Sequence, residues 1–399
     1  MNLEIPKKFK PVKEAALMAA KSVFRPISRK YDTLEHDYPK ELDLFAAALD
    51  GMNDAGSSIG GATGSRGETV DKNVVRNGGN MASVINIMTM CYGDVGLLLA
   101  IPRQGLGNAA ISAVANDEQL QRFGKLWAAM AITEPGAGSD SAAITTTAVK
   151  DGDEYILNGE KIFVTAGERA DAIVVWASLD KNLGRAAIKS FVVEKGTPGM
   201  ELVRLETKMG IRASDTAAIS FVNCRVPAAN LLGSPEIDVK NGFAGVMETF
   251  DNTRPFVAAM AVGCAEAALE RTKELLQNQI NLNYTSPINN LNAVEAEILK
   301  LEADYEAARL LTIKAAWMAD NKIPNSMEAS ICKAKAGRIG NKITLKCVEL
   351  CSSIGYSEGE LLEKWARDSK ILDIFEGTQQ IQQLIIARRL LGKSSKDLK

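Results

Sequence analysis

The feature that most constrains this chain is a change of residue pattern that occurs twice along its length. Up to about residue 127, segments such as AALMAAKSVF, MASVINIMTM and DEQLQRFGKLWAAM are rich in Ala, Leu and Met, which favours helices. From Ala131 the chain consists of short runs rich in Ile, Val, Thr and Phe, such as EYILNGEKIFVT and AAISFVNCRV, which favours strands. Beyond Gly242 the helical pattern returns and persists. We therefore expect three parts, in the order helical, β and helical.

The central part carries two dipeptides that are typical of tight hairpins. Asp151-Gly152 and Asn158-Gly159 suit type I′ turns, which need positive φ at both central positions. No helical segment separates the β-type runs, which disfavours a parallel sheet built with crossover helices. We therefore predict an antiparallel β-barrel or sandwich over residues 129–240.

The C-terminal part has the spacing of long amphipathic helices. Apolar residues recur at steps of three and four through Val294, Ile298, Leu301 and Tyr305. Further helical stretches are expected at about 327–351, 359–373 and 378–391. The prediction is an α+β multi-domain fold, with an N-terminal helical domain (1–128), a β domain (129–240) and a C-terminal four-helix-type bundle (241–399).

Composition excludes several classes of function. The 399 residues carry a formal net charge of −2 with basic residues scattered along the chain, so no nucleic-acid partner is predicted. No apolar run approaches the roughly 18 residues of a membrane span, and the start lacks a secretory signal, so a cytoplasmic location is expected. The six cysteines show no C-x-x-C spacing and are expected to be buried thiols: Cys91, Cys224, Cys264, Cys332, Cys347 and Cys351.

The chain has a single histidine, His36, in the polar stretch TLEHDYPK. A Ser-His-Asp hydrolase would depend on that one imidazole, and a zinc site typically needs several ligands of this kind. We therefore predict neither of them and no metal site. Any chemistry must come from carboxylates, backbone groups or a cofactor.

Three segments could carry such chemistry. AITEPGAGSDSA (131–142) is a Gly- and Pro-rich turn whose amides and hydroxyls suit either a connecting turn or a cofactor loop. KIFVTAG (161–167) contains Phe163, which on its own has the character of a core aromatic. DIFEGTQQIQQ (373–383) places Glu376 just before a helix that Thr378 can cap, where a solvated carboxylate is the ordinary alternative. The Gly-rich stretch SSIGGATGSRGE (57–68) lacks the ending of a phosphate-binding P-loop and is interpreted as a connection.

Taken together, these segments resemble the acyl-CoA dehydrogenases. Six stretches match signatures of that family in its order, along nearly the whole chain: TEPGAGSD, LNGEKIFVT, KMGIRASDT, RVPAANLLG, FDNTRP and IFEGTQQIQ. The resemblance implies an oxidoreductase of fatty acid β-oxidation that binds FAD between the β domain and the C-terminal helices. It assigns the cofactor to Thr133, Ser139, Phe163, Thr165, Thr378 and Gln380, with Phe163 where the family usually has Trp.

The same resemblance implies the chemistry and the substrate residues. Glu376 would take the α-proton of an acyl-CoA thioester while the β-hydrogen leaves as hydride to N5 of FAD, giving the trans-2-enoyl-CoA. Some relatives carry the base near residue 253, but Thr253 stands there and offers no competing carboxylate. The substrate channel is assigned to Phe243, Asp251, Arg254 and Gly377. Electron-transferring flavoprotein is the expected electron acceptor.

The chain departs from the family at positions that would contact the FAD of a neighbouring subunit. The positions that usually provide an Arg-x-x-Phe-Gly motif, and a Gln followed by two Gly, are occupied by Asn281, Tyr284, Thr285, Glu349, Ser352 and Ser353. Two interpretations follow: a homotetramer that holds FAD differently, or a heterotetramer whose paralogous partner supplies the missing groups. An acyl-CoA oxidase, an enoyl-CoA-reducing relative and a non-catalytic subunit are the functional alternatives.

Overall fold

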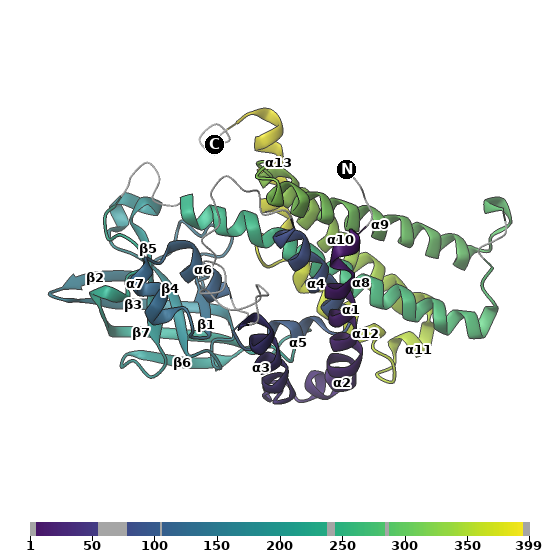
Figure 1. The fold of residues 1–399 in the computed structure, drawn as a ribbon, viewed down its shortest axis with the longest axis horizontal. Coiled ribbons are helices and arrows are strands. Elements are labelled where there is room, and N and C mark those ends of the chain that lie inside the picture. Colours follow the sequence, from purple (N-terminus) through teal and green to yellow (C-terminus); the bar gives the residue numbers. More distant parts are fainter. Residues whose placement is uncertain (1–4, 55–77, 104–105, 238–243, 284–286, 394–399) are drawn as a thin grey trace.

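The structure is a computed structural model that describes residues 5–54, 78–103, 106–237, 244–283 and 287–393. Figure 1 shows the strands gathered at one end of the molecule and the long helices at the other. The Gly-rich stretch 57–68, Phe243, Tyr284 and Thr285 lie outside the described residues.

The N-terminal part is helical, as predicted. Its α-helices are α1 (Lys10–Ala19), α2 (Arg25–Thr33), α3 (Glu41–Asp54), α4 (Gly79–Cys91), α5 (Val95–Leu99), α6 (Leu106–Val114) and α7 (Asp117–Phe123). Side-chain caps fix two of the starts: Asp94 accepts from Leu97 N at 2.8 Å, and Asn116 forms a capping box with Gln119. Helix α4 packs against the long C-terminal helices, so the N-terminal and C-terminal parts share one hydrophobic core.

The central part is one curled sheet of seven strands. The strands are β1 (Ala128–Ala131), β2 (Thr147–Asp151), β3 (Glu154–Thr165), β4 (Ala172–Ser178), β5 (Ile188–Glu194), β6 (Met200–Leu205) and β7 (Thr216–Pro227). Their order is β1-β4-β2-β3-β7-β6, and β5 also pairs with β4. Four pairings are antiparallel, but β1 and β2 run parallel to β4, so the sheet is mixed.

One of the two predicted hairpins is confirmed and the other is wrong. A hairpin joins β2 to β3 at the first of them, but its central residues are Gly152 and Asp153, because Asp151 pairs with Glu154 in the ladder. Only Gly152 has positive φ (+62°), so the turn is not the type I′ turn expected for Asp151-Gly152. Asn158-Gly159 instead lies inside β3, at an irregularity in its pairing with β7. A Cβ atom on Gly159 would lie 2.4 Å from the Thr146 hydroxyl, and the Asn158 side chain accepts from Asn223 N at 2.7 Å. The dipeptide therefore forms a bulge in β3, and its glycine lets the backbone of Thr146 approach closely.

The C-terminal part is built on three long helices, α8 (Ala244–Ile280), α9 (Ala293–Asp320) and α10 (Ser326–Leu350). The shorter helices α11 (Ser352–Tyr356), α12 (Leu362–Ser369) and α13 (Gln379–Leu391) follow, with the 3₁₀ turn η6 (Lys370–Asp373) between the last two. Helix α10 packs against α8, α9, α12 and α13, and so lies at the centre of the bundle. The predicted helical stretches agree with these bounds to within a few residues.

A buried ionic cluster joins the N-terminal and C-terminal parts. Lys364 Nζ lies 2.7 Å from Asp94 Oδ2 and 2.5 Å from Asp368 Oδ2, and all three side chains are buried. Ser28 also donates to Asp94, and Asp368 accepts from the amide of Ile211 at 2.6 Å. The cluster therefore ties α2, α5 and α12 to the segment between β6 and β7.

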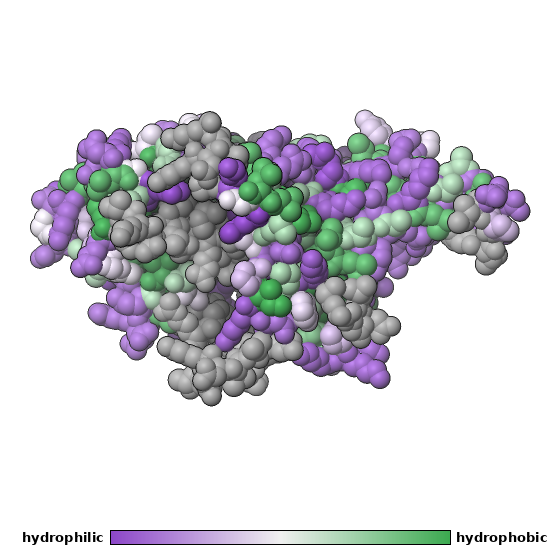
Figure 2. All heavy atoms as spheres, turned by 90° about the horizontal axis from the view of Figure 1, so that it is seen from above, coloured by the Kyte–Doolittle hydropathy of each residue, from purple (hydrophilic) through white to green (hydrophobic). Residues whose placement is uncertain are grey.

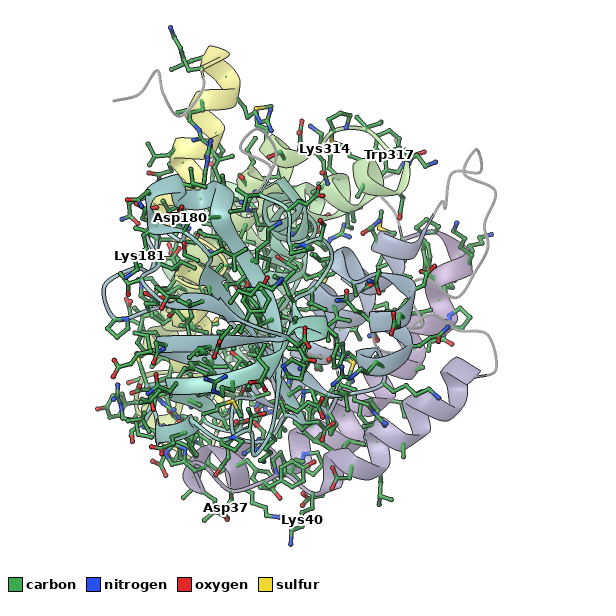
Figure 3. All side chains as sticks on the ribbon, turned by 90° about the vertical axis from the view of Figure 1, so that its left-hand side faces the viewer. Asp37, Lys40, Asp180, Lys181, Lys314 and Trp317 are labelled. Carbon is green, nitrogen blue, oxygen red and sulfur yellow. The ribbon has the colours of Figure 1, made fainter. Side chains whose placement is uncertain are left out.

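The surface carries polar links between elements as well as exposed apolar side chains. Figure 3 labels Asp37 and Lys40 in the link between α2 and α3, where the Asp37 carbonyl accepts from Arg169 at 2.9 Å. Figure 2 shows hydrophobic residues among hydrophilic ones when the molecule is seen from above. Helix α13 exposes Leu384, Leu390 and Leu391. In the part of the chain that the structure describes, no helix combines the length and apolarity of a membrane span.

Candidate active site

Glu376 lies in a tight turn between η6 and α13. Both Glu376 (φ +55°) and Gly377 (φ +92°) have left-handed backbone conformations. Such a conformation is uncommon for a residue with a side chain and is often found at functional sites. The φ of Gly377 strains any residue with a Cβ atom, and such an atom would also displace Gln382 Nε2, 2.5 Å away, so the position favours glycine.

The Glu376 side chain is half-buried and has a hydrogen-bond donor. Thr253 Oγ1, on α8, donates to Glu376 Oε2 at 2.7 Å. Burial raises the pKa of Glu376, while the Thr253 hydrogen bond and the positive charges of Arg254 and Lys333 oppose the rise. The alternative interpretation of Glu376, a fully solvated carboxylate near a helix start, is therefore wrong. A raised pKa in a partly dehydrated site suits a general base.

Two side chains hold the backbone of this turn. Lys333 Nζ, on α10, donates to the Gly377 carbonyl at 2.6 Å. Gln382 Nε2 donates to the Glu376 carbonyl at 3.0 Å and to the Gly377 carbonyl at 3.1 Å. The carbonyl groups of Glu376 and Gly377 are therefore both hydrogen-bonded, which restrains the backbone of the turn.

Sequence reasoning missed Lys333 and Gln382. A signal for Lys333 was available, because it falls three or four positions from Ala329, Ala336 and Gly337 on the buried stripe of α10. A lysine on a stripe of small buried residues is unusual and calls for a specific partner.

The turn at 131–142 is tied to β3. The Thr133 carbonyl accepts from Ile162 N at 2.9 Å, which brings Thr133 beside the end of β3 that carries Phe163 and Thr165. Glu134 is buried and accepts from Lys161 at 2.8 Å, and it also accepts from the amides and hydroxyls of both Thr145 and Thr146. This segment is therefore a rigid, specifically bonded turn.

Phe163 is not a core aromatic. Its side chain is 61% exposed and its φ is +56°, at the second irregularity in the pairing of β3 with β7. The bulge leaves the ring exposed, and Thr165, two positions further along β3, is half-buried, as is Thr133. An exposed aromatic ring of this kind could cover a flat heteroaromatic group.

The remaining predicted residues have varied positions. Thr378 accepts from Ile381 N and caps α13, whereas Gln380 and Ser139 are exposed. Arg254 is 4% exposed and lies close enough to Glu376 to influence its pKa. Asp251 belongs to α8, but its side chain lies outside what the structure describes.

Four of the positions that depart from the family pattern are described by the structure, and all four are at the surface of this chain. Asn281, Ser352 and Ser353 are exposed, and exposed Glu349 pairs with Lys346 at 2.7 Å. The six cysteines are buried and free, as predicted.

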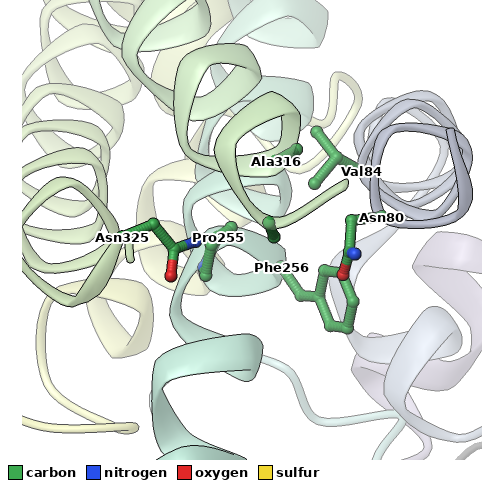
Figure 4. A pocket seen from close by; sticks show the side chains of 7 residues that line it. Asn80, Val84, Pro255, Phe256, Ala316 and Asn325 are labelled. Atoms are coloured by element: carbon green, nitrogen blue, oxygen red, sulfur yellow. The ribbon is translucent and has the colours of Figure 1, made fainter. Parts of the chain in front are cut away.

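A small hollow lies beside α8, and none of the predicted site residues lines it. It lies between α4, α8 and α9, and its lining includes Asn80, Pro255, Phe256 and Asn325 (Figure 4). The hollow has no room for even a water molecule, so it cannot be the substrate site.

Comparison with known proteins agrees with this geometry. Residues 129–224 match the family model "Acyl-CoA dehydrogenase, middle domain", and residues 240–391 match "Acyl-CoA dehydrogenase, C-terminal domain". The chain is 38% identical to acryloyl-CoA reductase (NADH) of Anaerotignum propionicum over 69% of its own length and 68% of that protein. It is also 38% identical to the mitochondrial short-chain specific acyl-CoA dehydrogenase of Bos taurus, over 65% of its own length and 62% of that protein.

The fold has equally clear relatives among solved structures. Butyryl-CoA dehydrogenase from Megasphaera elsdenii superposes with a TM-score of 0.84 at 29% identity, covering 98% of this chain and 100% of that one. The chain belongs to the acyl-CoA dehydrogenase family, and with it to the oxidoreductases that act on CH–CH groups.

Proposed function

We propose that this chain is an FAD-dependent acyl-CoA dehydrogenase that converts an acyl-CoA thioester to its trans-2-enoyl-CoA, with Glu376 as the base. The observation that carries the proposal is the Glu376 carboxylate itself. It is half-buried on a left-handed turn, its pKa is raised by burial, and Thr253 orients it. A carboxylate set in this way can accept a proton from a weak carbon acid.

The reaction divides between the α- and β-carbons of the acyl group. Glu376 would take the α-proton and become the neutral acid, and the electron pair left behind would form the new double bond. When bound, FAD supplies the acceptor for the β-hydrogen, which leaves as hydride to flavin N5. The Glu376 amide would donate to the thioester oxygen, which gains negative charge as the α-proton leaves.

FAD would lie between a β domain of residues 129–240 and a helical domain of residues 241–399. Thr133 and Thr165 would bond the flavin ring, and Phe163 would cover its edge. Ser139, Thr378 and Gln380 would hold the rest of the dinucleotide. The hydroxyls and the exposed ring at the end of β3 support this assignment.

The acyl-CoA would enter beside α8, where Phe243, Asp251 and Arg254 would line its path and Gly377 would leave room at the thioester. Arg254 is buried close to Glu376, which supports this direction of approach. Electron-transferring flavoprotein would then reoxidise the flavin.

The visible absorption spectrum of the purified chain tests the proposal. With a panel of saturated acyl-CoAs under anaerobic conditions, we expect a yellow protein whose flavin band bleaches with one class of substrate. A yellow protein that no acyl-CoA bleaches, but that an enoyl-CoA reoxidises after chemical reduction, would favour the reductive direction. The name of the Anaerotignum relative supports that second candidate.

The assembly is proposed to be a homotetramer, with the heterotetramer as the alternative. Exposed Leu384, Leu390 and Leu391 on α13 support burial of this helix between subunits. The exposed Glu349, Ser352 and Ser353 support a partner with different residues there. Mass measurement of the purified chain together with its FAD content decides: a tetramer without FAD would refute the homotetramer as the working form.

A further inference from the structure

Lys333 is a buried cation that differs from the other buried lysines. The buried lysines in the described part of the chain are Lys161, Lys333 and Lys364. Lys161 pairs with Glu134 at 2.8 Å, and Lys364 pairs with two aspartates. Within the described ranges, no carboxylate oxygen lies within the 4.0 Å of an ion pair to Lys333 Nζ. Burying a charge without a paired countercharge is costly, so the position calls for a specific role.

The contact that Lys333 makes is to the backbone that follows the base. Its ammonium group donates to the Gly377 carbonyl at 2.6 Å, a short charge-assisted hydrogen bond. Gln382, which is also fully buried, donates to the same carbonyl and to that of Glu376. Helices α10 and α13 therefore hold the turn from two sides.

The charges around Lys333 come from three elements. Asp373 on η6 and Glu376 in the turn are negative, and Arg254 on α8 is positive. Burial lowers the pKa of Lys333 to about 8, against the pull of the two carboxylates and with a contribution from Arg254. At neutral pH the ammonium form is therefore still present and can hold the carbonyl.

We propose that Lys333 is a positioning residue for the dehydrogenation site: by fixing the Gly377 carbonyl, it holds the left-handed turn that aims the Glu376 carboxylate and amide at the substrate. The inference rests on the proposed function, because it assumes that Glu376 is the base. Left-handed φ at Glu376 is unfavourable without such restraint, so the turn would relax when Lys333 is removed. A small displacement of a reacting group can cost about two orders of magnitude in rate.

The first test needs no substrate. Amide hydrogen exchange of a peptide spanning residues 371–383 is compared between wild type, Lys333→Met and Lys333→Arg. We expect roughly tenfold faster exchange at the turn in Lys333→Met, with Lys333→Arg close to wild type because a donor and a charge remain. Thermal unfolding should show Lys333→Met as stable as wild type or more so, since an unpaired buried cation has been removed.

The second test is the limiting rate of flavin reduction by the best acyl-CoA. In Lys333→Met this rate should fall roughly tenfold or more, while the dissociation constant of the acyl-CoA changes little. Wild-type exchange and wild-type rates in Lys333→Met would overturn the inference. A loss of thermal stability with unchanged exchange at the turn would also overturn it, since it would assign Lys333 a purely structural role.

Glu376→Gln separates the two claims. If Glu376→Gln reduces flavin as fast as wild type, the proposed function fails whatever Lys333 does. If Glu376→Gln is inactive and Lys333→Met is unaffected, the positioning role alone fails.

Discussion

Replacing Thr253 by valine removes a hydroxyl that donates to the Glu376 carboxylate while keeping the shape of the side chain. Thr253 is 7% exposed, and its Oγ1 lies 2.7 Å from Glu376 Oε2. A hydrogen bond to a charged group contributes about 1.5–3 kcal/mol, and solvent near the half-buried carboxylate favours the lower end of that range. Because about 1.4 kcal/mol corresponds to a tenfold change in an ionisation equilibrium, the protonated form of Glu376 should gain about tenfold in Thr253→Val.

The direction of the effect follows from the role of the base. Burial already raises the pKa of Glu376, and loss of a bond to the ionised form raises it further. A base must be ionised to accept a proton, so the rate of flavin reduction should fall at neutral pH and recover at higher pH. The acidic limb of the pH–rate profile should move upward by about one pH unit.

The assay is stopped-flow flavin reduction by a saturating acyl-CoA between about pH 5 and pH 9. Thr253→Ser is the matched control, because it retains the hydroxyl and should keep the wild-type limb. A Thr253→Val profile that overlays the wild type would refute the reasoning, as would an equal loss of rate at every pH.

Three further variants test the electrostatics of the structure. Glu376→Gln should increase the free energy of unfolding at neutral pH, because burial raises the pKa of this carboxyl group and folding therefore opposes its ionised form. The gain should shrink as pH falls through the raised pKa of the folded state and be lost below the ordinary value of 4.5, which denaturant titrations at pH 7 and pH 4 would show. Burial acts to raise the pKa of Glu134, but its hydrogen bonds outweigh burial and lower the pKa to about 2. The carboxylate therefore contributes stability above pH 4.5 that is lost as pH falls toward 2. Glu134→Gln should remove that part of the acid dependence of unfolding, and an unchanged acid profile would contradict the prediction. Lys364→Met leaves Asp94 and Asp368 buried without their cation and should cost about 3–5 kcal/mol in guanidinium titrations, whereas a loss below about 1 kcal/mol would show that the cluster is not stabilising.

The sequence predicted well those elements that depend only on residues close together in the chain. Helix α9 follows the apolar spacing from Val294 onward, and its start is fixed by a capping box between Asn292 and Glu295. The hairpin between β2 and β3 reverses the chain within two residues, Gly152 and Asp153. Such elements are decided within a few residues, so a single sequence contains enough information to place them.

The parts that sequence reasoning misplaced depend on distant residues. Asn158-Gly159 was predicted as a turn, but the approach of Thr146 and Asn223 makes it a bulge. The parallel pairing of β1 with β4 was also unexpected, because those strands are joined through the β2–β3 hairpin and need no crossover helix.

The site shows the same division. Motif resemblance indicated Glu376, while the alternatives for Glu376 and Phe163 could be decided only from burial and backbone conformation. The hydrogen bond from Lys333 to Gly377 spans 44 residues of sequence, and that from Thr253 to Glu376 spans 123. Contacts of this range arise from the packing of α8, α10 and α13, which no local pattern encodes.

The claim that Glu376 is the base of an acyl-CoA dehydrogenase is tested most directly by single-turnover flavin reduction in Glu376→Gln. The variant should bind FAD and acyl-CoA as wild type does, since the amide can still accept from Thr253. We predict bleaching of the flavin band by the best acyl-CoA in wild type, and a rate at least about a thousandfold lower in the variant, within the range that acid–base catalysis supplies. Bleaching at the wild-type rate in Glu376→Gln would contradict the account.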